Sequence, residues 1–523
     1  MWALLVWLFW TIAVPTAIAI GVSYLLRPDI EKPSVTGKYR FELPTAEEGR
    51  PFPVLFGKCR IRGLNAISPI FNKDRRVMIQ HDVIVGIRYY CGLHLGVGIG
   101  HINIKLLLFG DTTVWPAKKQ PSIEAADNLA GGDIDADDCW GRWDQGGAGG
   151  VNGNFAIQYG DDSQTLHYVL KDKFGSDQPA YRGFTSLILY GPYIGTSPQI
   201  RPISVLGKRT DWMCDYTTMW YLAKANMGDD DLNAIHIIYE ILTSTIIGRG
   251  IDPSLIGDSF KNAADTCYDE GYGLSCVWDW APDSIGAMIE QIEKIVDGKL
   301  YFSLETEKYE FGLNRPVDPE GLEEFDESDF WIESAGYLSM GLIPDKVIVL
   351  WEERLYNTKR VAYDDDIALY ARQNEESHID EKDYSNFIYN SSLARKIASR
   401  DQYMFSAMPK RFILHCLRTM IHLHETSVFK ISYPALNITS MMVRLVSIDR
   451  GSLTDSECII ECIEDVFGQA YTVYSEPPES KAEEEEGIQE SEYYDQESTV
   501  WDRLSNQIVY DKLSGNMVTW RHD

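Results

Sequence analysis

Apolar residues are unevenly distributed along this chain, and its most apolar stretch is its beginning. Residues 1–26 contain no charged side chain, and Arg27 ends the run. By length this segment qualifies as a transmembrane helix, although Pro15 would kink or divide it. Three interpretations stay open: a membrane anchor, an apolar helix buried at the centre of an oligomer, or a segment that is sheltered in an assembly and enters a membrane later. A secretory signal peptide is not expected, because the run lacks a basic start and Leu25-Leu26-Arg27 is no cleavage site.

Strand-like patterns dominate residues 38–215. Short apolar or alternating runs occur at residues 52–57, 59–63, 82–92, 101–109, 155–159 and 184–190. Such runs, bounded by turn residues, predict β-strands. A stretch rich in Gly and Asp at residues 116–154 predicts a loop insertion. We therefore expect an apolar segment with a linker at residues 1–37 and one β domain at residues 38–215.

Helical periodicity is strongest in the middle of the chain. Apolar spacing predicts helices at residues 233–247, 258–270 and 283–296. Asp258 or Ser259 suits the N-cap of the second helix, and Gly271 suits its end. Strand-like runs follow at residues 299–304 and 308–313. Helices followed by a hairpin predict a compact α+β domain over residues 216–335.

Residues 336–470 return to strand patterns. Strands are predicted at residues 346–351, 411–417, 427–432, 442–448 and 458–463, with a helix at residues 390–403. This composition indicates a small barrel or sandwich. The expected fold class is α+β and mostly β, with two β domains flanking an α+β middle domain. Residues 471–523 form an acidic linker and an apolar end that contains Trp501 and Trp520, either a docking tail or a frayed terminus.

Charge and cysteine content narrow the classes of function. The 78 acidic residues exceed the 48 Lys and Arg residues, which gives a net charge of −30 and argues against free nucleic acid as a partner. The nine cysteines include no CxxC pair. Cys458 and Cys462 would share a strand face but lie too far apart to bridge each other. Reduced, buried thiols are expected, as in a protein that is assembled in a reducing cytoplasm.

Few side chains indicate a metal-binding or catalytic site. Asp133, Asp135 and Asp137 are spaced like the start of a calcium loop, but the sixth position is Asp138 instead of Gly. His422 and His424 would share a strand face that could suit a metal, and surface histidines are the alternative. Neither a phosphate-binding loop nor a nucleophile with a supporting base occurs. We expect no catalytic residue and no cofactor, and therefore no enzyme.

Several short sequence motifs follow one another along the chain in an order that resembles that of a known protein family. They are LPTAEEGRPFPVLFG at 43–57, YRGF at 181–184, YIGTSP at 193–198, NAIHIIYEILT at 233–243, EGYGLS at 270–275, VSIDRG at 446–451 and EDVFG at 464–468. The order resembles that of the tail-tip hub and host-specificity proteins of long-tailed phages, a baseplate-hub-like family that includes the lambda tip attachment protein. Ala234 stands where relatives have Pro, and the chain lacks their distal receptor-binding modules. We therefore expect host recognition to belong to partners.

The resemblance implies a homotrimer at the tail tip of a virion, assembled in the host cytoplasm. Each copy would supply two tube-like β domains to a hexameric tail tube. The implied neighbours are the distal tail protein, the tape measure protein and tail fibre or tip proteins, with DNA only passing through the channel. Trp2, Trp7 and Trp10 would then contact the lumen or the host membrane, and Trp501 and Trp520 would dock the C-terminal tail.

A second class of function stays open beside the hub. A membrane-anchored bacterial envelope protein would use residues 1–26 as its span and carry a β-rich periplasmic body. Nine cysteines without an evident pairing pattern argue against an oxidising periplasm. A soluble trimer would favour the hub, and a monomer that requires detergent would favour the envelope protein.

Overall fold

The described part of the chain consists of several segments. The computed structural model describes residues 52–80, 83–110, 112–115, 132–134, 153–195, 200–214, 222–228, 230–281, 284–337, 343–354, 358–372, 377–451, 457–468, 509–510 and 517–518. All of them belong to one compact unit within residues 43–523. None of the helices in these segments is both long and apolar enough to cross a membrane. Residues 1–26 lie outside them, so the three interpretations of that segment stay open.

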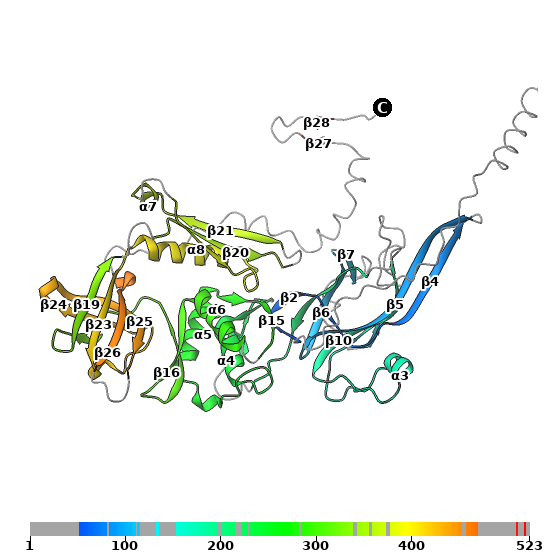
Figure 1. Ribbon diagram of the computed structural model, residues 1–523, viewed down its shortest axis with the longest axis horizontal. Helices are drawn as coiled ribbons and strands as arrows, with labels where there is room; N and C mark the ends of the chain where they lie inside the picture. The colour runs from blue at the N-terminus through cyan, green and yellow to red at the C-terminus, as the bar shows by residue number, and fades with distance from the viewer. Residues whose placement is uncertain are drawn as a thin grey trace, which may run out of the picture. The chain divides into compact units, whose positions relative to one another are not determined.

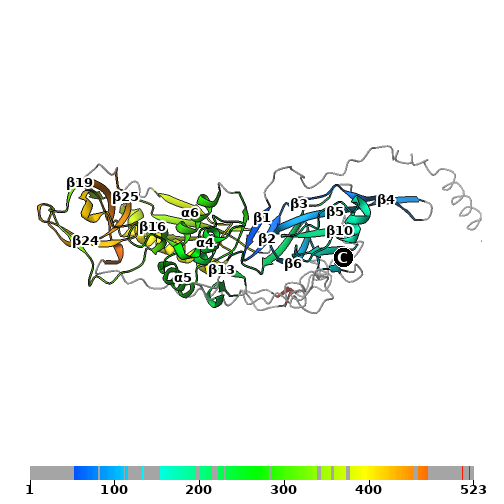
Figure 2. The ribbon, with the colours of Figure 1, turned by 90° about the horizontal axis from the view of Figure 1, so that it is seen from below.

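Two antiparallel sheets form the first part of the described chain. One has the order β3 (Asn65–Ala66), β5 (Val83–Ile99), β10 (Phe184–Gly195), β9 (Phe155–Gln158) and β8 (Gly132–Ile134), with β4 (Phe71–Gln80) also paired to β5. The other has the order β2 (Lys58–Arg62), β11 (Ile203–Arg209), β6 (Ile102–Phe109) and β7 (Thr112–Trp115). Figure 1 shows β4 and β5 as long paired strands, and Figure 2 shows β5 beside β10.

Residues 91–98 of strand β5 are buried on both faces, which explains their composition. Every second side chain from residue 91 to residue 97 is fully buried on one face. On the other face, Gly92 and Gly96 leave room for aromatic rings. A Cβ at Gly92 would lie 2.3 Å from the ring of Phe71, and one at Gly96 would lie 2.2 Å from the ring of Phe52. These two glycines therefore serve close ring packing, which any side chain would disturb.

The predicted middle helices are present. They are α4 (Ala234–Thr243), α5 (Ser259–Glu270) and α6 (Ile285–Val296), followed by the hairpin of β16 (Gly298–Ser303) and β17 (Lys308–Leu313). Asn233 caps α4, because its side chain accepts a hydrogen bond from the Ile235 amide. Gly271 ends α5 in the left-handed region with φ +80°, as the sequence predicts. Asp258 precedes α5 but makes no side-chain cap bond.

The last part contains two further sheets. A small sheet has the order β21 (Lys359–Asp365), β20 (Lys346–Glu352) and β22 (Ile379–Asp383), and α8 (Ser391–Ser406) lies along β20 and β21 (Figure 1). A six-stranded sheet has the order β18 (Glu324–Phe325), β24 (Val428–Tyr433), β25 (Ile438–Asp449), β26 (Glu457–Glu464), β23 (Lys410–Leu417) and β19 (Phe330–Tyr337). The short helix α7 (Ile367–Arg372) was not expected from the sequence.

The described chain is therefore mostly β with few helices, which confirms the coarse fold class. One pairing crosses the expected first boundary: β1 (Pro53–Phe56) pairs with β15 (Cys276–Asp279). The helices α4, α5 and α6 pack in one core with this pair of strands, with β20 and with α8. The finer scheme of two tube-like β domains around a middle domain stays a prediction.

Candidate functional site

A buried ion pair connects strand β11 with helix α4. Arg209 Nη2 lies 2.5 Å from Glu240 Oε2, and their side chains are 2% and 0% exposed. The other carboxylate oxygen of Glu240 accepts a hydrogen bond from the Met213 amide at 2.6 Å. The Arg209 guanidinium also lies 4.9 Å from the centroid of the Phe56 ring on β1. One charged pair thus fixes the first sheets, β1 and the middle helices to one another.

A second arginine, Arg354, lies where three segments meet just after β20. Its Nη2 donates to Asp231 Oδ1 at 2.8 Å, and its Nη1 donates to Ser275 Oγ at 3.1 Å. The same Nη1 donates to the backbone carbonyl of Lys58 on β2. Because arginine offers its donors in a rigid planar fork, these acceptors must hold fixed positions around it.

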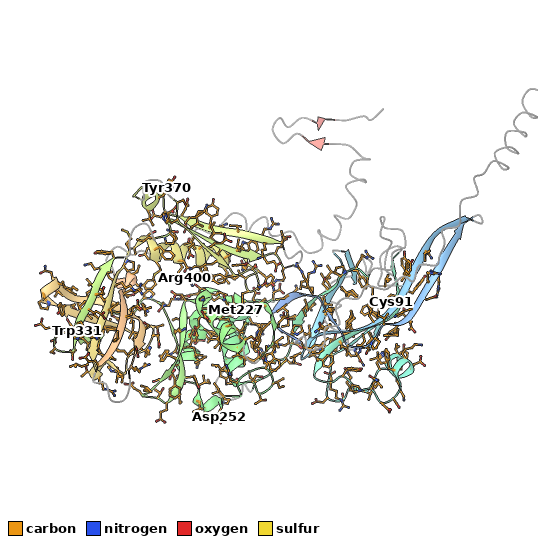
Figure 3. All side chains as sticks on the ribbon, in the orientation of Figure 1. Cys91, Met227, Asp252, Trp331, Tyr370 and Arg400 are labelled. Atoms are coloured by element: carbon orange, nitrogen blue, oxygen red, sulfur yellow. The ribbon has the colours of Figure 1, made fainter. Side chains whose placement is uncertain are left out.

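Two more arginines hold the last part of the chain to the middle helices and the β16–β17 hairpin. Arg400 on α8 (Figure 3) donates to the carbonyl of Ile295 on α6 at 2.7 Å and to Asp401 at 2.8 Å. Arg444 on β25 donates to Asp465 at 3.1 Å and to the carbonyl of Arg315 at 2.8 Å. Both arginines donate charge-assisted hydrogen bonds to backbone carbonyls, so each contact forms only when the two segments lie in this arrangement.

The sheet of β21, β20 and β22 presents an apolar face opposite α8. Val361, Tyr363 and Ile379 on this face are 57%, 56% and 56% exposed. Strand pairing places Val361 and Tyr363 beside the half-buried Leu350 and Ile348. Exposed apolar clusters are typical of surfaces that contact another protein. The sequence did not single out this face, because its strands are short and their neighbours are not evident from local pattern.

The side chains of Ser68 and His94 are in contact. Ser68 Oγ lies 3.2 Å from His94 Nδ1, and His94 is fully buried. Burial lowers the pKa of His94 to about 3. The ring also packs edge-on against Tyr181, with centroids 4.6 Å apart. A buried imidazole with so low a pKa is a weak base at neutral pH, so this contact suits packing better than nucleophile activation.

The histidines that the sequence singled out do not converge on one another. His422 Nε2 lies 2.8 Å from Glu323 Oε2. His424 stacks on Tyr301 with ring centroids 3.9 Å apart, and its Nδ1 donates to the Glu425 carbonyl at 3.0 Å. Each ring thus has its own partners. Within the described segments, no group of three His, Cys, Asp or Glu residues could hold a metal ion.

The remaining predicted site residues fall outside the described part. Asp133 belongs to β8, but its side chain is not described, and Asp135 and Asp137 lie outside the described residues. The predicted contact residues there are Trp2, Trp7, Trp10, Trp501 and Trp520. The calcium loop and both contact segments therefore stay predictions.

Comparison with known proteins finds similarity to this chain among solved structures only. No family model matches the chain, and no curated protein matches it. A chain from the virion of a native gene transfer agent particle has a TM-score of 0.52 and 10% identity, over 84% of this chain and 91% of that chain. A tail protein of Neisseria meningitidis MC58 has a TM-score of 0.29 and 9% identity, over 60% and 88%.

A 43 kDa tail protein of prophage MuSo2 from Shewanella oneidensis has a TM-score of 0.25 and 9% identity, over 80% of this chain and 98% of that chain. The scores of these two tail proteins are too low to show a shared fold. The first likeness shows that this chain has the fold of a virion protein over most of its length.

Proposed function

We propose that this chain is a structural subunit of a phage-like tail, and that it is the hub which closes the tail tube at its tip. The observation that carries the proposal is the fold it shares with a gene transfer agent virion chain, over 84% of this chain and 91% of that chain. The ordered phrases between residues 43 and 468 support the same conclusion independently, because they come from sequence and not from shape.

Three copies of the chain form the hub in this proposal. They attach to the distal tail protein and the tape measure protein, hold tail fibre or tip proteins, and open for DNA passage during infection. The net charge of −30 supports this role, because acidic surfaces repel the DNA backbone and let it slide without sticking. The four arginines described above support it too, since a hub must keep its parts in register under load. We assign no catalytic step to the chain.

An image of the intact particle tests the proposal directly. We expect three copies of the chain in a ring at the far end of the tail tube, with their acidic surfaces around the channel. Six copies along the tube, or a single copy away from the tail axis, would refute the trimeric hub. A position in the capsid would refute the tail assignment altogether.

A solution measurement separates the hub from the membrane-anchored envelope protein. The full chain, purified without detergent, is expected to sediment with three times its 59.4 kDa mass. A detergent-dependent monomer would favour the envelope protein. A variant that lacks residues 1–26 serves as the matched control: if it is soluble and still trimeric, the described body carries the trimer contacts and the apolar segment does not.

A further inference from the structure

Two cysteines lie directly opposite each other on neighbouring strands. The antiparallel register of β23 and β26 pairs Cys416 with Cys458. Directly opposed residues in antiparallel strands have Cα atoms about 4.5–5.5 Å apart and side chains on the same face. A disulfide needs Cα atoms about 4.4–6.8 Å apart. The backbone therefore already holds the two residues at bonding distance.

Both thiols are free and enclosed by the core of the six-stranded sheet. Cys416 is fully buried and Cys458 is 1% exposed. Cys458 Sγ lies 3.7 Å from the carbonyl oxygen of Cys416, so its side chain is directed at the opposite strand. The contact with Cys416 lowers the pKa of the Cys458 thiol below its usual value, burial opposes this, and the positive charge of Arg450 adds to it. The same contact, together with burial, raises the pKa of the Cys416 thiol. A thiolate is the nucleophile in disulfide exchange, so Cys458 is the better attacking group.

The pair lies where the strand ladder ends. Cys416 is followed by Leu417, the last residue of β23, and Cys458 is preceded by Glu457, the first residue of β26. Leu417 pairs with Glu457 in the same register. Strand ends open locally at a smaller free-energy cost than strand centres. A small oxidant can therefore reach Cys458 without unfolding of the whole sheet.

We propose that Cys416 and Cys458 form a disulfide bond when the protein passes from a reducing to an oxidising environment. The Cys458 thiolate attacks one sulfur of a small-molecule disulfide, which forms a mixed disulfide and releases one thiolate. Cys416 then loses its proton to solvent and attacks the Cys458 sulfur, which releases the second thiolate. Two protein thiols are oxidised, and one small disulfide is reduced to two thiols.

The cross-link joins two central strands of the sheet and closes the chain between residues 416 and 458, which contains β24 and β25. Only the timing rests on the proposed function: a tail subunit assembles in a reducing cytoplasm and leaves it when the host cell opens. The chemistry needs only the geometry of the two strands. The bond would then fasten this sheet after assembly.

Cys462 provides a matched control within the same strand. It is fully buried in the same core, four residues from Cys458. Its cross-strand neighbours are Phe412 and Leu445, so it has no opposing thiol. Burial also raises the pKa of the Cys462 thiol. Cys462 and Cys458 are equally buried but face different residues on the neighbouring strands. A comparison of the two therefore isolates the effect of an opposing thiol.

The experiment uses the purified, reduced full chain. It is incubated with oxidised glutathione under native conditions, alkylated, digested and mapped by mass spectrometry. We expect one cross-linked peptide that joins Cys416 to Cys458, with Cys462 alkylated, and a rise of roughly 5 °C in the unfolding temperature of this part of the chain. The Cys462→Ser variant is expected to give the same cross-link, and Cys458→Ser none.

Two results would overturn the proposal. One is recovery of both Cys416 and Cys458 in alkylated form after prolonged oxidation. The other is a cross-link of Cys458 to Cys462 or to a more distant cysteine. If Cys458→Ser does not fold, Cys416→Ala replaces it, and the peptide map of the unaltered chain decides in either case. Because no virion is needed, failure here leaves the hub proposal intact, and failure of the particle image leaves the disulfide intact.

Discussion

Replacing Glu240 with Gln tests whether the buried ion pair holds the first sheets to the middle helices. Gln keeps the size of the side chain and a carbonyl oxygen for the Met213 amide, but it removes the negative charge. Arg209, whose side chain is 2% exposed, would then be a buried cation without its counterion. Removing one partner of a buried pair costs about 3–5 kcal/mol, because the remaining charge stays desolvated.

The assay must report locally, since a chain of 523 residues is not expected to unfold in one step. Hydrogen exchange followed by mass spectrometry reports on peptides that cover Met213 and α4 (Ala234–Thr243). A loss of 3–5 kcal/mol in local stability corresponds to exchange on the order of a hundredfold to several thousandfold faster. The double variant Arg209→Met with Glu240→Gln is expected to recover much of this protection, because it leaves no buried charge.

The matched control is Glu290→Gln in the exposed Glu290–Lys294 pair of α6, whose side chains are 57% and 53% exposed. We expect little change there, because exposed pairs are screened by solvent. The reasoning is refuted if Glu240→Gln changes exchange in α4 by less than threefold, or no more than Glu290→Gln does in α6. It is also refuted if the double variant is as unprotected as the single one.

Three further predictions concern stability. The pKa of His94 is about 3 in the folded protein and near 6.5 in the unfolded chain, so the free energy of unfolding should fall as the pH drops from 6.5 towards 3. His94→Phe should reduce the slope of the free energy of unfolding against pH in this range by up to about 1.4 kcal/mol per pH unit. Gly57→Ala should lower the melting temperature more than Gly110→Ala, since both have positive φ but only the Gly57 Cβ would meet atoms, at 2.1 and 2.9 Å. Phe260→Ala should lower local stability by about 3–5 kcal/mol, measured by hydrogen exchange in peptides that cover α5, because the ring is fully buried against Phe311.

Local sequence pattern predicted the four longer helices α4, α5, α6 and α8 well and their ends less well, but it missed the short helices α3 (Tyr168–Phe174) and α7. The periodic segments at 258–270 and 283–296 became Ser259–Glu270 and Ile285–Val296. The segment at 233–247 became a helix that ends at Thr243. All ten residues of that helix are buried, so no polar face marks its length, and the end is fixed by Ser244, which is extended with ψ 131°. A wholly buried helix thus carries less information about its boundary than an amphipathic one.

Contacts between distant segments could not be predicted, because periodicity shows which face a residue takes and not which strand lies beside it. Cys458 illustrates this. Its spacing from Cys462 argues against a bond between the two, but it does not show that the opposing residue is Cys416 on β23. Arg209 and Glu240 are likewise an ordinary basic and an ordinary acidic residue until β11 and α4 are brought together.

Four arginines that are buried or largely buried suggest how an acidic chain keeps its parts in place. The chain has only 48 basic residues against 78 acidic ones, yet Arg209, Arg354, Arg400 and Arg444 occupy junctions between segments. Burying a charge is costly, and the attraction to its partner often does no more than offset that cost. Their value therefore lies in position: three of them donate to backbone carbonyls of distant segments, which a shifted segment could not supply. A mispositioned segment would leave a largely buried cation unpaired, so these contacts favour one arrangement of the parts over its alternatives.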